Sequence, residues 1–477
     1  MKKRWLAVAT VAAVLIGSVV LALVVGVNQQ VTPSTRPQNE TTIGVFGTLG
    51  SRTAIGGAND YADVGGDNRA GCGVYRGIES GTDNWAWTTG FIPDTSAKAG
   101  GTFDVAGDPV VAVDGSGIFY YACLASDTTR PFRARITVST STNGGASWGS
   151  PVQVARGSGR LGPFPDKPSL AADQDNSNVY IAWTRFGGAV RAPIQFARST
   201  DGGVTFSRAR TFSLIGFSAN QGSSIAEGTG TPGNVYVAFE NFNTVPCCSF
   251  WLAKSTDDGA TFSSLVEVAD GGGPIVVHDI PSPLAGASFR VNSFPQLAVN
   301  RSNGDLYIVW AENVSSSNPA EIKFIRSTDG GATWSAPACV GDCATASAQF
   351  FPAISVAPNG SRIDVVYYGC VSAASSGACD NAEFNLRYVS WDGTTFVSGN
   401  PAFSSPVTVN SVGPIDGGVG FCGQFFGDYN GVASTNDRAY PLWTDTRNFS
   451  AGDPRICNPG MVPVDDNQDV YFAAITP

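Results

Sequence analysis

The sequence predicts an all-β protein that folds as a six-bladed β-propeller with four strands in each blade. A short phrase recurs at Ser141–Trp148, Ser199–Phe206, Ser255–Phe262 and Ser327–Trp334, with a worn copy at Ser390–Phe396. A pair of strand-like segments precedes each phrase. The composition, with 57 Gly, 28 Pro and 14% charged residues, is typical of a turn-rich β protein. Repetition at such a period indicates a solenoid, an array or a propeller.

Each copy of the phrase, which we name the turn motif, is expected to form a tight turn. In Ser199-Thr-Asp-Gly-Gly-Val-Thr-Phe206 the Asp side chain can bond its own backbone, and the glycines supply positive φ. The aromatic residue that ends the motif can pack back under the turn. The turn motif therefore predicts one hairpin corner in each structural unit.

Six units show the same order of a short apolar run, a polar turn and an alternating strand. These units begin at Asp108, Lys167, Gln221, Phe294, Phe351 and Asp428. A third strand leads into the turn motif and a fourth follows it, which gives four strands per unit. The unit spacing is roughly 60 residues, a little above that of other propeller repeats. The absence of helical periodicity argues against a TIM barrel, and a β-sandwich would not repeat in this way.

The two ends of the chain are expected to close the ring. Asp469–Pro477 resembles the third strand of the sixth unit and stops where a turn motif would begin. The segment Asn84–Ile92 is the candidate for the missing outer strand, and its pairing would remove a free sheet edge. The predicted domains are a signal peptide or signal anchor (1–30), a polar linker (31–45), an N-terminal segment that supplies the closing strand (46–105) and the propeller (106–477).

The N-terminus has the pattern of an export signal. Met1–Arg4 is basic and an apolar run extends from Trp5 to Val27. The run is long enough to span a bilayer, so both a cleaved signal peptide and an uncleaved membrane anchor remain open. In either case the remainder of the chain is expected outside the cytoplasm, either secreted or membrane-anchored.

Ten cysteines fit that compartment, because disulfides persist in oxidising surroundings. The expected pairs are Cys339–Cys343, Cys370–Cys379, Cys72–Cys123 and Cys422–Cys457, whereas the adjacent Cys247 and Cys248 stay unassigned. The chain has no Cys-x-x-Cys pair and a single histidine, His278, which we expect to be structural. A zinc site is therefore not predicted, and we expect no metal and no cofactor.

The charge balance limits the possible partners. The chain has 29 Lys and Arg against 39 Asp and Glu, a net charge of -10. Nucleic acid and anionic membrane surfaces are disfavoured, because phosphate binding needs a basic field. We expect a monomer whose ligand is a glycan or a glycoprotein, with membrane contact only through the N-terminal apolar segment.

The turn motif resembles the Asp-box, Ser-x-Asp-x-Gly-x-Thr-Trp, of the sialidase-like propellers (the BNR repeat), over about the last three-quarters of the chain. In that superfamily the motif lies at a blade corner away from the active site. The resemblance therefore implies structural roles for Asn143, Asp201, Asp257 and Asp329. It places a functional site at the opposite mouth of the channel, where first strands enter and second strands exit.

Carboxylates, cations and aromatic rings are expected to converge at this mouth, which is the kind of surface that binds sugars. The alternative is that these are ordinary loop charges paired with one another. By resemblance to sialidases, hydrolysis would use a Tyr nucleophile, a carboxylate partner, an Asp acid and an arginine clamp. The candidate catalytic residues are Tyr429, Glu240, Glu312 and Asp127, and the candidate substrate-binding residues are Arg185, Arg387, Arg447, Asp108, Asp428 and Asp445.

The chain departs from the sialidase pattern at two positions where the family has a functional arginine and a functional glutamate. The first family arginine is replaced by Gly107-Asp108-Pro109, and the family glutamate at the fourth unit is replaced by Ser293-Phe294-Pro295. Three functions therefore stay open. They are a propeller that binds glycan or protein without catalysis, an exo-sialidase-type glycoside hydrolase with Tyr429 as nucleophile, and another carbohydrate-active enzyme such as a lyase.

Overall fold

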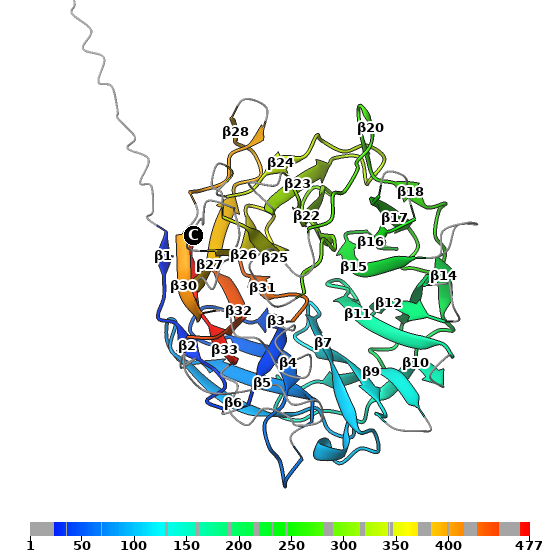
Figure 1. Ribbon diagram of the computed structural model, residues 1–477, viewed down its shortest axis with the longest axis vertical. Helices are drawn as coiled ribbons and strands as arrows, with labels where there is room; N and C mark the ends of the chain where they lie inside the picture. The colour runs from blue at the N-terminus through cyan, green and yellow to red at the C-terminus, as the bar shows by residue number, and fades with distance from the viewer. Residues whose placement is uncertain are drawn as a thin grey trace, which may run out of the picture.

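The computed structural model shows the described strands arranged as seven blades around one central channel (Figure 1). The propeller prediction is confirmed, and the prediction of six blades is wrong by one. The structure describes residues 23–34, 36–67, 69–128, 132–158, 162–187, 192–212, 219–230, 232–243, 247–280, 290–314, 320–341, 343, 347–370, 383–397, 400–405, 407–414, 427–447 and 468–477.

The blades follow one another along the chain. The first consists of β3 (Gln38–Phe46), β4 (Thr53–Asp60), β5 (Gly71–Glu79) and β6 (Trp85–Phe91). The second consists of β7 (Val105–Val113), β8 (Phe119–Ser126), β9 (Arg133–Ser141) and β10 (Val152–Ser158). The third consists of β11 (Phe164–Ala172), β12 (Val179–Phe186), β13 (Ile194–Ser199) and β14 (Arg210–Phe212). The fourth consists of β15 (Asn220–Gly228), β16 (Asn234–Asn241), β17 (Ser249–Ser255) and β18 (Val266–Glu267).

The remaining blades complete the ring. The fifth consists of β21 (Gln296–Val299), β22 (Leu306–Glu312), β23 (Glu321–Ser327) and β24 (Ala338–Cys339). The sixth consists of β25 (Gln349–Val356), β26 (Ile363–Cys370), β27 (Glu383–Trp391) and β30 (Val407–Pro414). The seventh consists of β31 (Gly431–Ser434), β32 (Ala439–Asp445), β33 (Asp469–Phe472) and β2 (Gln29–Gln30), extended by β1 (Val24–Val25) and β34 (Ile475–Thr476). The short elements outside the blades are η1 (Ala97–Ala99), β19 (Ala269–Asp270), β20 (Gly273–Pro274), β28 (Phe396–Val397) and β29 (Asn400–Pro401).

The hydrophobic core lies between neighbouring blades. The second strands of the blades are mostly buried, and all seven residues of β22 and of β32 are buried. Trp183, Trp310 and Trp443 occupy equivalent positions in three such strands, and each is at most 1% exposed. Large aromatic side chains therefore fill the wedge-shaped space between blades, which explains why apolar residues on both faces of these strands are needed.

The turn motifs form the predicted corners. In the third blade Ser199 Oγ donates to Asp201, and Gly203 N donates to Ser199 Oγ at 2.9 Å. Thr205 donates from its backbone N and from Oγ1 to the two carboxylate oxygens of Asp201, at 2.8 and 2.6 Å. The motifs around Asp257 and Asp329 repeat these bonds, and Asn143 takes the same place in the second blade. The Asp or Asn side chain of each motif therefore stabilises its corner, and its oxygen atoms accept hydrogen bonds within the turn.

The segment predicted to close the last blade belongs instead to the first. Trp85–Phe91 pairs along β5 as its outer strand. Trp85 and Trp87 nevertheless contact the last blade through packing. Their rings lie 5.1 and 4.9 Å from the ring of Phe472. The first and last blades are therefore joined here by aromatic packing, and the outer strand of the last blade comes from β2.

The predicted polar linker is also corrected, because it lies inside the propeller. Val31 is 3% exposed, and β3 begins at Gln38 with a run of buried residues. Residues 1–22, which hold most of the predicted signal peptide or anchor, lie outside the described residues. Within the described ranges, no helix combines the length and the apolar character needed to cross a membrane.

The N-terminal strands close the ring. β2 pairs with β33, β1 pairs with β34, and backbone bonds of 2.8 Å join Gly26 N to Ala474 O and Val31 N to Val470 O. The first and last residues of the propeller therefore share one sheet. This arrangement covers the outer edge of β33, which would otherwise present unpaired backbone groups.

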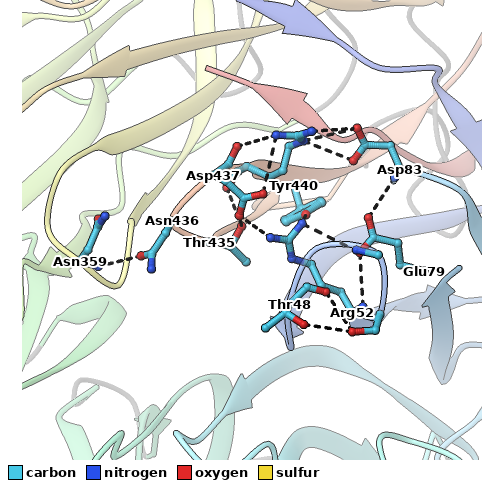
Figure 2. A network of polar contacts seen from close by, with 12 residues as sticks. Thr48, Arg52, Glu79, Asp83, Asn359, Thr435, Asn436, Asp437 and Tyr440 are labelled. Carbon is cyan, nitrogen blue, oxygen red and sulfur yellow. Dashed lines mark hydrogen bonds and ion pairs between the residues drawn. The ribbon is translucent and has the colours of Figure 1, made fainter. Parts of the chain in front are cut away.

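A second contact between the first and last blades is a polar network centred on Arg52 (Figure 2). The Arg52 guanidinium is 3% exposed and contacts Asp437 and the Tyr440 hydroxyl of the seventh blade. Glu79 of the first blade accepts bonds from Gly50 N at 2.8 Å and Asp83 N at 3.0 Å. Because buried charges are stable only when they are paired, this network fixes the two blades in one register.

The structure confirms two predicted disulfides, Cys72–Cys123 and Cys339–Cys343. It also joins the unassigned neighbours Cys247 and Cys248 to each other. Cys370 is disulfide-bonded, whereas Cys379, Cys422 and Cys457 lie outside the described residues. The Cys72–Cys123 bond links β5 to β8 and so ties the first blade to the second.

Removing the closing strands should destabilise the whole ring. We compare a chain that begins at Leu23 with one that begins at Thr32. The shorter chain loses the pairing of β1 and β2 and the buried Val31 side chain, so its free energy of unfolding should fall by about 3 kcal/mol or more. Urea unfolding followed by tryptophan fluorescence measures this difference. Equal midpoints for the two chains would show that β1 and β2 do not hold the ring closed.

Candidate functional site

The inner strands of five of the seven blades carry irregularities at matching places. The ladders between first and second strands skip residues after Asn39, Gly107, Asp166, Gln221 and Phe350. Within the skips, Glu40, Asp108, Lys167 and Phe351 adopt positive φ values of 60°, 51°, 50° and 48°. Such backbone costs a non-glycine residue about 1–3 kcal/mol and is concentrated at functional sites.

Proline explains several of these bulges. Pro109, Pro168 and Pro352 directly follow the residues with positive φ. A proline cannot donate to a β-ladder and is accepted in strands mainly at edges and bulges. Each Asp-Pro, Lys-Pro or Phe-Pro pair therefore interrupts the ladder at the mouth of the channel and releases one side chain from strand geometry.

Asp428 is the centre of the charged cluster at this mouth. Its side chain is 4% exposed, and its carboxylate contacts both the ammonium of Lys167 and the guanidinium of Arg290, whose Nε lies 2.9 Å from Oδ1. Asn292 Nδ2 donates to the Asp428 carbonyl at 3.0 Å. Burial acts to raise the pKa of Asp428, but the charges of Lys167 and Arg290 outweigh it and lower that pKa. Asp428 is thus an ionised anchor for two cations.

Other carboxyl groups surround this ion cluster. Asn59 Nδ2 donates to Glu40 at 2.7 Å, while Asn59 Oδ1 accepts from Asp108 N at 2.8 Å. Burial, followed by the charge of Asp108, raises the pKa of Glu40 well above its ordinary value. The same two causes raise the pKa of Asp166 to about 7. The mouth therefore contains both ionised and proton-retaining carboxyl groups.

A cavity of about 260 Å³ opens beside the cluster. It is lined by charged, amide and aromatic groups, among them Lys167, Gln221, Phe242, Asp279, Arg290, Asn292, Phe294 and Asp428. We name this cavity the mouth pocket. Gly222 leaves room for the Phe294 ring, because a Cβ at residue 222 would meet that ring at 2.4 Å.

Tyr429 does not have the surroundings of a nucleophile. Its hydroxyl donates to the carbonyl of Pro109 at 3.0 Å. Burial, followed by the charge of Glu40, raises its pKa well above the ordinary value of a tyrosine. A nucleophilic tyrosine needs a base that removes its proton, and a backbone carbonyl cannot act as one. The described structure therefore gives the Tyr429 hydroxyl a backbone acceptor and does not place a basic side chain in hydrogen-bond contact with it.

The three carboxyl candidates for catalysis have neighbours other than Tyr429. Glu240 is completely buried next to Asp279, and Glu312 accepts bonds from His278 Nδ1 at 3.0 Å and from Trp310 Nε1 at 3.2 Å. Asp127 forms a paired contact with Arg133 at 2.7 and 3.1 Å. His278 is accordingly a partner of Glu312. These bonds hold the carboxyl groups in separate local pairs and do not assemble the predicted hydrolase.

The predicted arginine clamp is not assembled either. Arg447 binds Asp445 at 2.7 Å and stacks over the Tyr471 ring, while Arg387 lies on β27 and donates to Thr408 at 2.7 Å. Arg185 pairs with Pro165 at the end of β12. The alternative of locally paired loop charges thus holds for Asp127, Asp445 and Arg447, whereas Asp108 and Asp428 do belong to the central cluster.

Several residues of the site were missed. Glu40 and Asn59 belong to the first blade, which has no turn motif, and Glu40 is not followed by a proline. Asp279, Arg290 and Asn292 lie in the long connection between β20 and β21, where no strand pattern places them. The available signal was Asn292-Ser-Phe-Pro, because the Phe-Pro pair marks an inner strand and Asn292 comes just before it.

Two groups of described residues have the spacing of metal ligands, but members of each group already bond to protein partners. Cys247 and Cys248 near Asp279 are joined in a disulfide. At the opposite mouth, Asp175 and Glu227 bind Arg301 at 2.7 and 3.0 Å. Burial raises the pKa of Glu227 to about 8 even though Arg301 acts to lower it. Neither group supports a metal site.

Protein stability should fall as pH rises through neutrality. Asp166 and Glu227 keep a proton in the folded state that the unfolded chain has already released, so their contribution is present at low pH and is lost as pH passes about 7 and 8. The free energy of unfolding should decrease by about 2–4 kcal/mol between pH 5 and pH 9. Asp166→Asn with Glu227→Gln should flatten this slope in thermal unfolding, and the exposed control Asp63→Asn should not. An unchanged slope in the double variant would contradict the assignment.

Comparisons with known proteins do not assign a family or an activity to this chain. No protein-family model and no curated protein matches this chain. Among solved structures, a protein of unknown function from Dyadobacter fermentans is 14% identical over 78% of this chain and 94% of its own, with a TM-score of 0.48. The α-L-arabinanase of Penicillium chrysogenum, complexed with arabinobiose, is 13% identical over 76% and 98%, with a TM-score of 0.47. The Trypanosoma rangeli sialidase is 13% identical over 82% and 56%, with a TM-score of 0.42. Likenesses this distant carry no argument about function, and the fold stands on its strand pairing.

Proposed function

We propose that this protein is an exported propeller that binds a neutral, hydroxyl-rich glycan in the mouth pocket without cleaving it. The composition of the pocket is the observation that carries the proposal. Phe242 and Phe294 offer apolar faces, Gln221 and Asn292 offer amides, and Asp279 offers an exposed acceptor. Ligand sites of this kind combine an apolar wall with a few polar groups that fix orientation.

A neutral ligand fits better than an anionic one because the cations of the pocket are already paired. Both Lys167 and Arg290 contact the carboxylate of Asp428. An acidic sugar would have to compete with this buried partner, whereas a hydroxyl group can accept from the remaining N–H groups. Glycan hydroxyls are also donors, which suits the Asp279 carboxylate across the pocket.

Binding is favoured over sialidase-type hydrolysis for a geometric reason. Hydrolysis through Tyr429 would require a basic group at its hydroxyl, and that hydroxyl is used by the Pro109 carbonyl. Export is supported by the basic and apolar start of the chain and by the disulfides of the blades. The strained inner-strand residues support a site at this mouth, because such backbone persists where function requires it.

Glycan binding should depend on the aromatic wall of the mouth pocket. Isothermal titration of the full chain with cellohexaose, xylohexaose, mannohexaose and arabinohexaose should give binding to at least one of them. Phe294→Ala should weaken that binding about tenfold or more, since it removes a stacking surface worth roughly 1.5 kcal/mol or more. The control Phe396→Ala, an exposed ring on β28, should leave affinity unchanged. If no neutral or acidic glycan on an array is bound, the proposal fails and a protein partner becomes the better explanation.

A further inference from the structure

Glu240 is a buried acid that the proposed binding site does not yet explain. It lies near the end of β16, where its register partners are Gln221 on β15 and Phe250 on β17. Its exposed fraction is 0%, and neither carboxylate oxygen receives a hydrogen bond from a donor among the described residues. A buried ionised carboxylate without donors is strongly disfavoured. The neutral, protonated form of Glu240 is therefore the favoured one.

The neighbour of Glu240 is Asp279, which lies on the wall of the mouth pocket. Asp279 is exposed, and its Oδ2 lies 3.5 Å from the Sγ of Cys248. The backbone of Cys248 exchanges two hydrogen bonds of 2.7 Å with Val277. The disulfide-bearing turn thus holds the segment that carries Asp279 against β17, beside the end of β16.

Two carboxyl groups in such contact share a proton rather than ionise together. The buried member retains it, because burial and then the charge of Asp279 raise the pKa of Glu240 well above its ordinary value. A protonated carboxyl gains one O–H donor, and the acceptor beside it is the Asp279 carboxylate. Protonation therefore gives the buried Glu240 carboxyl a hydrogen-bond partner, which the ionised group lacks among the described residues.

We propose that Glu240 is a positioning residue, a buried protonated donor that orients the Asp279 carboxylate as the acceptor for ligand hydroxyl groups in the mouth pocket. The inference rests on the proposed glycan binding. It adds the hydrogen bond from a ligand hydroxyl to Asp279, which would favour a hydroxyl-rich glycan. Asp279 touches the ligand, and Glu240 acts through it. A hydrogen bond to a charged acceptor contributes more than a neutral one, so loss of this support should be measurable.

The arrangement makes ligand binding sensitive to alkaline pH. The elements against Glu240 contribute the uncharged Gln221 from β15 and Phe250 from β17, and the connecting segment contributes Asp279. Across the pocket, Arg290 and Lys167 are held by Asp428, and His278 is paired with Glu312. When Glu240 ionises, its donor is lost and two carboxylates face each other, so Asp279 should leave its binding orientation.

The test compares Glu240→Gln and Glu240→Ala with the unchanged full chain, using the same four hexasaccharides in isothermal titration at pH 6 and pH 9.5. An amide at residue 240 can donate at both pH values, so Glu240→Gln should bind within about twofold of the unchanged chain at pH 6 and should lose no affinity at pH 9.5. The unchanged chain should weaken as pH rises, and Glu240→Ala should bind about tenfold more weakly at pH 6.

Glu227→Gln is the matched control, since Glu227 is a buried proton-retaining carboxyl at the opposite mouth. It should alter the pH dependence of stability and leave hexasaccharide affinity unchanged. Thermal unfolding gives a second measurement without ligand. Between pH 6 and pH 9.5 the unfolding temperature of Glu240→Gln should fall less than that of the unchanged chain. Parallel pH profiles for Glu240→Gln and the unchanged chain, in binding or in unfolding, would overturn the inference while glycan binding itself stands. Absence of binding by all four probes and by every glycan on the array would overturn both proposals.

Discussion

The closure of the ring is the constraint on which the rest of this structure depends. Seven blades can surround one axis only if the last sheet is held against the first. Here the N-terminal strands β1 and β2 pair with the C-terminal strands β34 and β33 in one sheet. The Arg52 network repeats the connection with buried charges. The charged cluster is a product of closure, because Glu40 comes from the first blade, Lys167 from the third and Asp428 from the seventh. These groups meet only around a completed ring.

The sequence was most informative where a local rule repeats. The turn motifs and the alternating strands predicted the propeller and six of its blades, because each motif is stabilised by bonds within a few residues of itself. The first blade escaped notice because its corner uses another device, in which Glu79 accepts from Gly50 N and Asp83 N. The closing strands are two residues long, which is too short for any periodicity to show.

The sequence predicted which end of the blades carries the charged cluster, but it did not predict which side chains contact one another there. Asp108 lies in the bulge of β7 and Asp428 lies just before β31, and both belong to the charged cluster. Asp279 and Arg290 lie in an irregular connection, and only the folded chain brings Arg290 to Asp428. The positions of Glu240 and Glu312 at the ends of second strands were right, but their roles depend on Asp279 and His278. Such long-range neighbours leave no trace in residue spacing.

The bulged residues at the channel mouth have an evolutionary consequence. Glu40, Asp108, Lys167 and Phe351 sit at matching points of four blades, each within a skip of the strand ladder. Their side chains can change without altering any strand register, because the ladder already bypasses them. The scaffold therefore offers a circle of substitutable positions, one for each such blade, at which the chemistry of the mouth can diversify while the surrounding sheets remain the same.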